Sequence, residues 1–278
     1  MIKKILKMIE KNRNSPRYFW KALISLKDSF WRIKTKLIFF KNYLKLKYLI
    51  LTTGKINNLE PFERQIYSQN GEDGIIEAIF SKIGSTNKYF VEFGGGEEKF
   101  NNTKYLRNKK NWHGLWLDSE GDRFTKKEFI TAENITEIFK KYKVPLKFDL
   151  LSIDVDGNDY WLWKSLKDYS PRLVIIEYNS SYPPTESKAI KYNPKFKWDG
   201  TDYFGSTLLA LKELGAKKGY TLVYCESTGS NAFFIRTDCL SNKFVIRPLS
   251  KIYRPANYYH TGKGHSKSKK RLEDISKV

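Results

Sequence analysis

Apolar and polar positions recur along the chain in a pattern of short strands separated by helices. Short apolar runs, which are typical of buried strands, occur seven times between residues 88 and 238. The predicted strands are 88–94, 113–119, 128–134, 147–156, 172–179, 220–227 and 231–238. The intervening stretches predict helices at 101–110, 135–142, 158–167 and 202–218, and a further helix at 70–84 precedes the first strand.

This order of elements predicts an α/β fold. Strands that alternate with helices form a parallel sheet with helices on both faces. The last two predicted strands are joined by only a few residues around Gly229, too few for a crossover helix. The last strand is therefore expected to run antiparallel, as one arm of a hairpin. The expected architecture is a seven-stranded, mostly parallel sheet with its last strand reversed.

Residues 1–55 read as a separate basic helical extension. From Phe19 to Leu44 an apolar residue recurs at alternating steps of four and three, which is heptad spacing. Lysines fall between these positions, so no stretch is apolar enough to span a membrane. The helix is expected either to lie on an anionic membrane surface through residues 19–51, to pair as a coiled coil, or to pack on the rest of the chain.

The net charge of +21 is concentrated at the two ends of the chain. Fifteen of the 51 Lys and Arg residues lie in residues 1–55, and the segment 261–278 is predicted to be a disordered basic tail. Residues 56–260, the expected catalytic domain, carry a net charge of only +4. A nucleic-acid partner is therefore not expected.

Cysteine usage indicates a reducing compartment. Cys225 and Cys239 are the two cysteines, and they form neither a disulfide framework nor a metal-binding spacing. The chain is expected in the cytoplasm, with peripheral attachment to the inner face of the membrane through its first helix.

The stretch "VEFGGG" ends the first predicted strand of the sheet. In open α/β sheets the ligand lies beyond the carboxyl ends of the strands, where a glycine lets the backbone approach it closely. Glu92, Gly94, Gly95 and Gly96 are therefore predicted to bind a cofactor. A dinucleotide fingerprint would need glycine at position 99, which is Lys99, and this counts against a nicotinamide cofactor.

The second predicted strand ends in Asp118, followed by Ser119. A carboxylate at this place can accept hydrogen bonds from both ribose hydroxyls of a nucleotide-like ligand. Asp118 and Ser119 are therefore predicted to bind the ribose, although an acid that merely ends a strand is common.

Further acids and an amide end the fourth and fifth predicted strands. These residues, Asp154, Asp156, Glu177 and Asn179, are the candidate catalytic group. Asp154 or Asp156 could accept a proton as a general base. Alternatively, Asp154, Glu177 and Asn179 could hold Mg²⁺, or the acids could only cap the next helix.

Taken in order, these motifs resemble the FkbM-like branch of the class I S-adenosylmethionine-dependent methyltransferases. The resemblance covers residues 60–240 and is carried by "YSQNGEDGII", "VEFGGG", "WLD", "TAEN", "SIDVDGNDYWLW" and "IIEYN". It implies a Rossmann-like sheet, S-adenosylmethionine as cofactor, and Glu133 and Asn134 beside the adenine. Asn134 is equally well suited to cap the helix that follows it.

The resemblance also implies a reaction and an acceptor. It suggests O-methylation of a sugar or glycolipid hydroxyl in surface polysaccharide synthesis. An RNA methyltransferase and a catalytically silent Rossmann-fold interaction protein are the alternatives. The aromatic loop 180–205 is expected either to contact a flat acceptor or to pack as a lid, whereas His113, His260 and His265 show no catalytic spacing.

Overall fold

The computed structural model describes residues 54–94 and 101–275, and residues 1–53, 95–100 and 276–278 lie outside this description. The chain divides after Gly54 into two units, and the fold below is that of the second unit. The predicted amphipathic helix over 19–51 falls on residues that are not described. No helix within the described ranges is both long and apolar enough to cross a bilayer.

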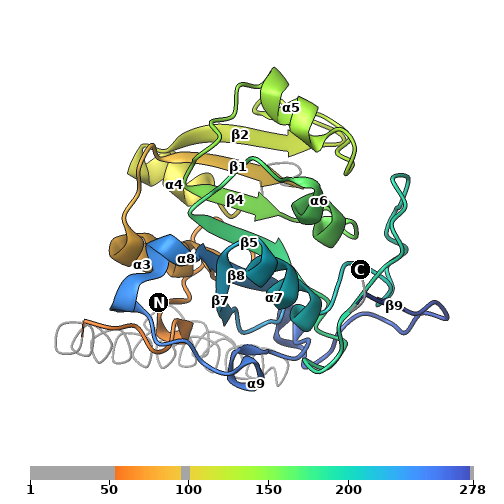
Figure 1. Cartoon of the computed structure of the whole chain (residues 1–278). Helices are drawn as coiled ribbons and strands as arrows, with labels where there is room; N and C mark the ends of the chain where they lie inside the picture. The colour runs from red at the N-terminus through yellow and green to blue at the C-terminus, as the bar shows by residue number, and fades with distance from the viewer. Residues whose placement is uncertain (1–53, 95–100, 276–278) are drawn as a thin grey trace, which may run out of the picture. The chain divides into compact units, whose positions relative to one another are not determined.

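A seven-stranded sheet forms the centre of the described unit, as the sequence predicts (Figure 1). Its strands are β1 (Tyr89–Phe93), β2 (His113–Asp118), β3 (Thr125–Lys127), β4 (Leu150–Ile153), β5 (Leu173–Glu177), β7 (Tyr220–Cys225) and β8 (Asn231–Arg236), in the order β3-β2-β1-β4-β5-β8-β7. β8 runs antiparallel to both of its neighbours, β5 and β7. The pairings from β3 through β5 are all parallel, which confirms the predicted Rossmann-like sheet with its last strand reversed.

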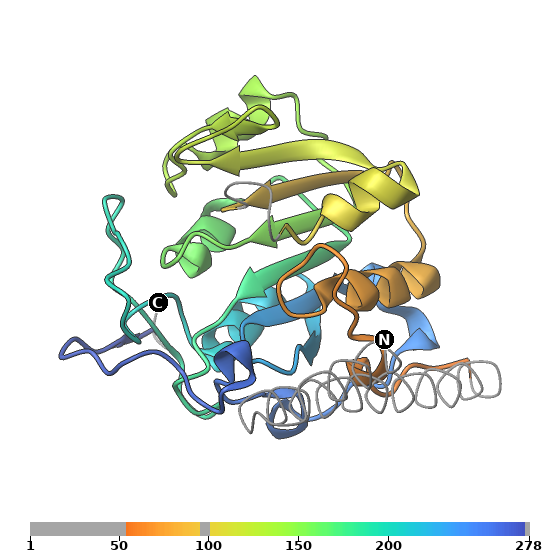
Figure 2. The same ribbon diagram turned by 180° about the vertical axis from the view of Figure 1, so that it is seen from behind.

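Helices cover both faces of this sheet. α5 (Ile135–Lys141), α6 (Asp159–Ser165) and α7 (Leu208–Lys217) lie on one face, and α3 (Glu72–Ile83) and α4 (Lys104–Lys110) lie on the other (Figures 1 and 2). Val91 and Phe93 join a buried cluster with Phe139 of α5 and Trp163 of α6. Because side chains alternate along a strand, Glu92 points to the opposite face.

Short elements complete the described unit. These are the 3-10 turns η1 (Glu60–Phe62), η2 (Ser241–Lys243) and η3 (Tyr258–His260), the helices α8 (Thr237–Leu240) and α9 (Leu249–Ile252), and the paired strands β6 (Lys188–Ala189) and β9 (Glu273–Asp274). Helix α3 has its acids in the first turn and ends at Gly84 as predicted, and the Ser68 hydroxyl accepts the backbone N–H of Asp73 at 3.1 Å.

Two predicted elements lie elsewhere in the structure. The third strand of the sheet is Thr125–Lys127, whereas residues 128–134 form no strand. The Asn134 side chain accepts the N–H of Thr131 and donates to the carbonyl of Phe129, and such local bonds compete with a strand ladder. Helix α7 starts six residues later than predicted, at Leu208, because Thr207 caps it by accepting the Ala210 N–H.

The prediction of a disordered basic tail is wrong for residues 261–275. β9 pairs antiparallel with β6, and Leu272 and Ile275 are buried. The buried carboxylate of Asp202 accepts the N–H of Ser268 at 2.7 Å. Two apolar anchors and one buried acid thus hold a segment whose composition alone suggests disorder.

Candidate functional site

Gly94 is the point where the carboxyl ends of three strands meet. Its φ is +69°, and a Cβ built there would lie only 1.5 Å from the carbonyl oxygen of Asp154 at the end of β4. Its N–H donates to the carbonyl of Leu117 in β2 at 3.0 Å. Only glycine fits such a position without moving the β4 backbone. Gly95 and Gly96, the other two predicted glycines, lie outside the described residues.

Glu92 holds the chain where it returns to the sheet at residues 102 and 103. Its carboxylate accepts the backbone N–H of Asn102 at 2.6 Å, the N–H of Thr103 at 3.1 Å, and the Thr103 hydroxyl at 2.5 Å. The Trp116 indole in turn donates to that hydroxyl at 2.7 Å. Burial raises the pKa of Glu92 to about 7, against the lowering effect of these hydrogen bonds. Glu92 therefore positions the backbone, and it lines neither of the cavities described next.

A cavity of about 330 Å³ opens beyond the carboxyl ends of β1, β2 and β4. Gly94 from β1, Asp118 and Ser119 from the end of β2, and Asp154 and Asp156 from the end of β4 line it. Leu117, Phe129 and Ile130 supply an apolar wall. We call this space the first cavity; its volume is within the range of small-molecule sites, and it is walled by apolar groups with a few convergent polar ones.

Asp118 presents its carboxylate at the edge of the first cavity. One oxygen, Oδ1, accepts the backbone N–H of Glu120 at 2.9 Å and the Ser119 hydroxyl at 3.4 Å. Within the described ranges, Oδ2 has no hydrogen-bond donor from the protein. The arrangement leaves acceptor capacity for the hydroxyl groups of a ligand.

Glu133 and Asn134, predicted beside the adenine, do not line the first cavity. Asn134 occupies the N-cap position of α5, and its side chain forms hydrogen bonds with the backbone of Thr131 and Phe129. Glu133 is exposed and accepts the Tyr192 hydroxyl at 2.5 Å. The preceding residues Glu128, Phe129 and Ile130 occupy this side of the cavity instead.

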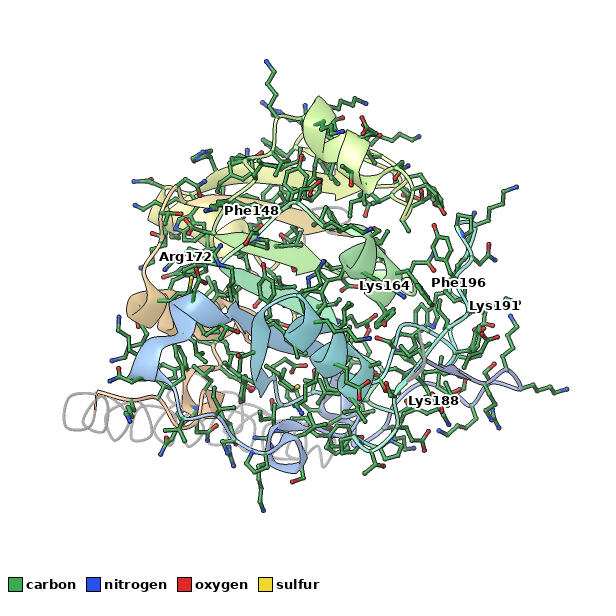
Figure 3. All side chains as sticks on the ribbon, in the orientation of Figure 1. Phe148, Lys164, Arg172, Lys188, Lys191 and Phe196 are labelled. Carbon is green, nitrogen blue, oxygen red and sulfur yellow. The ribbon has the colours of Figure 1, made fainter. Side chains whose placement is uncertain are left out.

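Phe196 covers the first cavity from the long loop. Its ring packs on Gly157, where an added Cβ would lie 2.3 Å from the Phe196 Cε1 atom. Figure 3 shows Phe196 on the loop that rises beside α6. Trp198, two residues further on, also lines the cavity. Part of the aromatic loop is thus a wall of the site.

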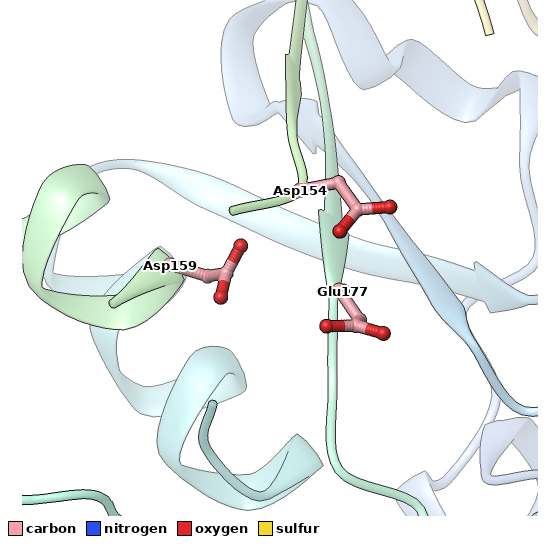
Figure 4. Close-up of side chains that lie close together, drawn as sticks. All are labelled: Asp154, Asp159 and Glu177. Atoms are coloured by element: carbon pink, nitrogen blue, oxygen red, sulfur yellow. The ribbon is translucent and has the colours of Figure 1, made fainter. Parts of the chain in front are cut away.

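Three carboxylates gather at the ends of β4 and β5 (Figure 4). Asp154, Asp159 and Glu177 each place one oxygen within 4.8 Å of the others. Asp159 is satisfied by the backbone N–H groups of Val155 at 2.9 Å and Gly157 at 3.0 Å. Glu177 differs, since its Oε2 is shielded from solvent and has no hydrogen-bond partner within the described part of the chain.

Burial and mutual repulsion raise the pKa values of the carboxyl groups in this cluster. Burial, followed by the negative charges of its neighbours, raises the pKa of Asp154 and of Glu177 well above the usual range. Burial raises the pKa of Asp159 to about 7. Asp156 has a φ of +54° and is an exposed residue overall, but its carboxyl group is partly withdrawn from water; this desolvation and the charge of Asp118 raise its pKa. Such a group is poised to share protons or to receive a cation.

Asn179 is not part of this cluster, in contrast to the sequence prediction. Its side-chain amide donates to the carbonyls of Asp202 at 2.8 Å and Phe204 at 3.0 Å, and its oxygen accepts the Ser181 N–H at 3.1 Å. The predicted Mg²⁺ ligand set of Asp154, Glu177 and Asn179 is therefore not formed. The buried Asn179 amide instead holds the end of the long loop against β5.

A second cavity, of about 140 Å³, adjoins the first. Asp154, Asp156 and Trp198 line both cavities, so they form the boundary between them. Glu177, Asn70, Asn231 and Ser230 supply polar groups, and Tyr258, Tyr259 and His265 supply ring surfaces. No sequence pattern points to Tyr258, Tyr259 or His265 as site residues, because they lie where the domain is predicted to end and the basic tail to begin.

The acid cluster predicts an unusual pH dependence of stability for the protein without ligand. Because the folded-state pKa values are raised, the native state holds more protons than the unfolded chain between about pH 4.5 and about pH 7. This stabilisation is present below the unfolded-state pKa and is lost as pH rises through the folded-state values. Glu177→Gln removes one ionising group, so its melting temperature should fall less than that of the wild type between about pH 5 and about pH 8.

Differential scanning calorimetry of both proteins across this range measures the effect. The other titrating groups are the same in both proteins. The difference between their two pH profiles therefore reports on Glu177 and the acids that interact with it. Equal pH slopes for the two proteins would show that Glu177 does not take part in a proton-holding cluster.

Comparisons with known proteins found similarity to solved structures alone. No family model matches the chain, and no curated protein matches it. Similar solved structures include the pyocyanin biosynthetic protein PhzM, at 13% identity and a TM-score of 0.30, covering 58% of this chain and 54% of that one. The chain thus spans about half the length of PhzM.

Two further structures are similar to a comparable degree. An S-adenosylmethionine-dependent methyltransferase from Clostridium acetobutylicum is 10% identical with a TM-score of 0.32, covering 69% of this chain and 98% of that one. The O-methyltransferase NcsB1 from neocarzinostatin biosynthesis, in complex with S-adenosyl-L-homocysteine and 1,4-dihydroxy-2-naphthoic acid, is 16% identical with a TM-score of 0.30. That match covers 83% of this chain and 66% of NcsB1.

Proposed function

We propose that the protein is an S-adenosylmethionine-dependent methyltransferase. The observation that carries this proposal is that Gly94 and Asp118, from the ends of two adjacent strands, border one cavity that the side chains of residues 54–94 and 101–275 leave open. A backbone without Cβ admits an adenosyl ligand closely, and the free oxygen of Asp118 can accept its ribose hydroxyls. Apolar Phe129 and Ile130 offer a surface for the adenine.

The charge of the site suits the same ligand. When bound, S-adenosylmethionine supplies a methyl group on a positively charged sulfur. Asp154 and Asp156 line the first cavity at its boundary with the second cavity. Their negative charge favours a cation there, and a cation would in turn relieve the repulsion among the acids.

The second cavity is the proposed acceptor site, because it opens directly beyond this boundary. In-line transfer requires the nucleophile to approach the methyl group from the side opposite the sulfur. The amides of Asn70 and Asn231, the carboxylate of Glu177 and the rings of Tyr258 and His265 line the cavity. Polar groups beside aromatic faces suit a sugar, so we propose O-methylation of a sugar or glycolipid hydroxyl, as the FkbM-like resemblance also suggests. The basic helix predicted over residues 19–51 would hold the enzyme at a membrane where glycolipid acceptors reside.

The proposed reaction does not call on Mg²⁺. The predicted third ligand, Asn179, is engaged by two backbone carbonyls, and Asp159 is already satisfied by two backbone N–H groups.

Asp118→Ala is expected to weaken the binding of S-adenosylmethionine by roughly 10- to 100-fold. The variant loses hydrogen bonds to a charged acceptor, which contribute about 1.5–3 kcal/mol. Isothermal titration calorimetry of the purified protein measures the dissociation constant directly. Asp168→Ala is the matched control, since Asp168 is an exposed carboxylate in the connection that leads into β5, away from the carboxyl ends of the strands. Undiminished binding by Asp118→Ala, or no binding by the wild type, would overturn the proposal.

A further inference from the structure

His265 reaches the second cavity from a part of the chain that lies beyond the sheet. The segment that carries it is fixed at Asp202, whose N–H donates to the Ser266 carbonyl at 2.8 Å and whose carboxylate accepts the Ser268 N–H. His265 is half-buried and lines the cavity together with Asp154, Asp156 and Glu177. It therefore stands on the acceptor side of the boundary between the two cavities.

Three aromatic rings fix the orientation of the His265 imidazole. Its centroid lies 4.6 Å from Trp198 and 5.6 Å from Phe204, both edge-on, and 4.6 Å from Tyr258 at an interplanar angle of 38°. Tyr258 is itself held by a hydrogen bond of 3.2 Å between its hydroxyl and that of Ser180. The ring is thus held by packing, and within the described part of the chain its nitrogens form no hydrogen bond with the protein.

Burial keeps the His265 imidazole neutral near neutral pH. Burial lowers the pKa of His265 from its usual value of 6.5, while the negative charges of Asp156 and Asp202 oppose this shift. Lys267 pairs with Asp202 at 2.9 Å and offsets part of that negative charge. Tyr258 contacts the ring and stays neutral, since burial raises its pKa above the usual value. A neutral imidazole on the acceptor side has the form that a general base needs.

We propose that His265 is the general base of the reaction and that the second cavity holds a polyhydroxyl acceptor. This inference rests on the proposed function. As the acceptor oxygen bonds to the methyl carbon, the carbon–sulfur bond breaks with its electron pair going to the sulfur. The proton of the acceptor hydroxyl passes to an imidazole nitrogen of His265, which completes the balance.

The carboxylates of the site are less suited than His265 to take the proton of the acceptor hydroxyl. Asp159 is occupied by two backbone donors, and Asp154 and Glu177 hold protons at higher pH than ordinary acids do. They are better placed to hydrogen-bond neighbouring hydroxyl groups of the acceptor. His265 lines the same cavity, and burial lowers its pKa, so that it is ready to accept a proton.

The stretch "QNGED", residues 69–73, helps to form the second cavity. The buried carboxylate of Glu72 accepts the backbone N–H of Asn70 at 2.8 Å and the side-chain amide of Asn231 at 2.9 Å. Glu72 thereby positions two residues that line the acceptor cavity, although it lines neither cavity itself. Fixed amides and carboxylates around a small space favour a ligand rich in hydroxyl groups.

Nuclear magnetic resonance of the imidazole groups tests the acceptor site without requiring turnover. The chain has three histidines, and His113 lies at the start of β2, so it serves as an internal control. The full chain saturated with S-adenosylhomocysteine is titrated with methyl β-D-galactopyranoside and with methyl α-D-mannopyranoside. We expect the His265 signals to shift with at least one glycoside while those of His113 stay unchanged. No selective shift of His265 with either probe would overturn the assignment of the acceptor site.

Turnover with the glycoside that shifts His265 most tests the role of the base. His265→Ala should lower the rate of S-adenosylhomocysteine release by about 10²- to 10⁴-fold, with unchanged affinity for S-adenosylmethionine. Added imidazole should restore part of the rate, and His113→Ala should behave as the wild type. The wild-type rate should decrease as the pH is lowered beneath about 6.5, because His265 becomes protonated.

The outcomes of this test separate the two proposals. A His265→Ala variant that binds the cofactor and turns over at the wild-type rate, or that imidazole does not rescue, would overturn the role of His265 alone. A wild-type protein that fails to bind S-adenosylmethionine would overturn the proposed function, and with it this inference.

Discussion

Gly94→Ala is expected to abolish cofactor binding and to destabilise the fold. The added methyl group would meet the Asp154 carbonyl oxygen at 1.5 Å, and the φ of +69° is itself unfavourable for alanine. The left-handed backbone costs about 1–2 kcal/mol, and overpacking costs about 1–3 kcal/mol more. Relief of the collision must move the ends of β1 and β4 apart, and a displacement of about 1 Å is enough to lose on the order of 100-fold in a preorganised site.

Gly219→Ala is the matched control for this variant. Gly219 has a φ of +79°, so alanine carries a similar backbone penalty there, but nothing lies within 4 Å of the added Cβ. It sits between α7 and β7, away from both cavities. Calorimetric titration and thermal unfolding of both variants separate the two effects. Cofactor affinity in Gly94→Ala equal to that in Gly219→Ala would mean that the β1 turn does not contact the ligand.

Glu92→Ala is expected to cost on the order of 3–5 kcal/mol in the free energy of unfolding. Two backbone N–H groups, of Asn102 and Thr103, and the Thr103 hydroxyl would lose their shared acceptor in a buried place. Each buried donor left without a partner costs about 1–3 kcal/mol. Because these residues follow the glycine turn, cofactor affinity should fall as well.

Chemical denaturation with urea measures this loss. Glu137→Ala serves as the control, since Glu137 is an exposed acid of α5 whose solvent-screened pairing with Lys140 at 2.8 Å should contribute little to stability. A loss in Glu92→Ala as small as that in Glu137→Ala would contradict the anchoring role given to Glu92.

The sequence predicts the type of sheet and the main turn of the site for clear physical reasons. A parallel sheet follows from strands that alternate with helices, and the short connection at Gly229 forces β8 to reverse. Gly94 is predictable because a backbone turn beneath a ligand tolerates no Cβ. Asp118 is predictable because the carboxyl ends of parallel strands meet at one edge, and the structure brings both residues to one cavity.

Other features depend on contacts that no local pattern encodes. Asn179 follows Glu177 by two residues, so alternation places both on one side, yet the chain leaves the sheet after Glu177 and the amide is used to hold Asp202 and Phe204. His265 lies in a basic, polar stretch that reads as disordered. Its place at the cavity depends on the burial of Leu272 and Ile275 further along the chain.

A crystal structure of the protein with S-adenosylhomocysteine tests the central claim most directly. We expect the ribose hydroxyls within hydrogen-bonding distance of Asp118, the backbone of Gly94 against the ligand, and the sulfur facing the boundary formed by Asp154 and Asp156. Density for the ligand anywhere outside the first cavity, or a ribose that does not touch Asp118, would contradict the account.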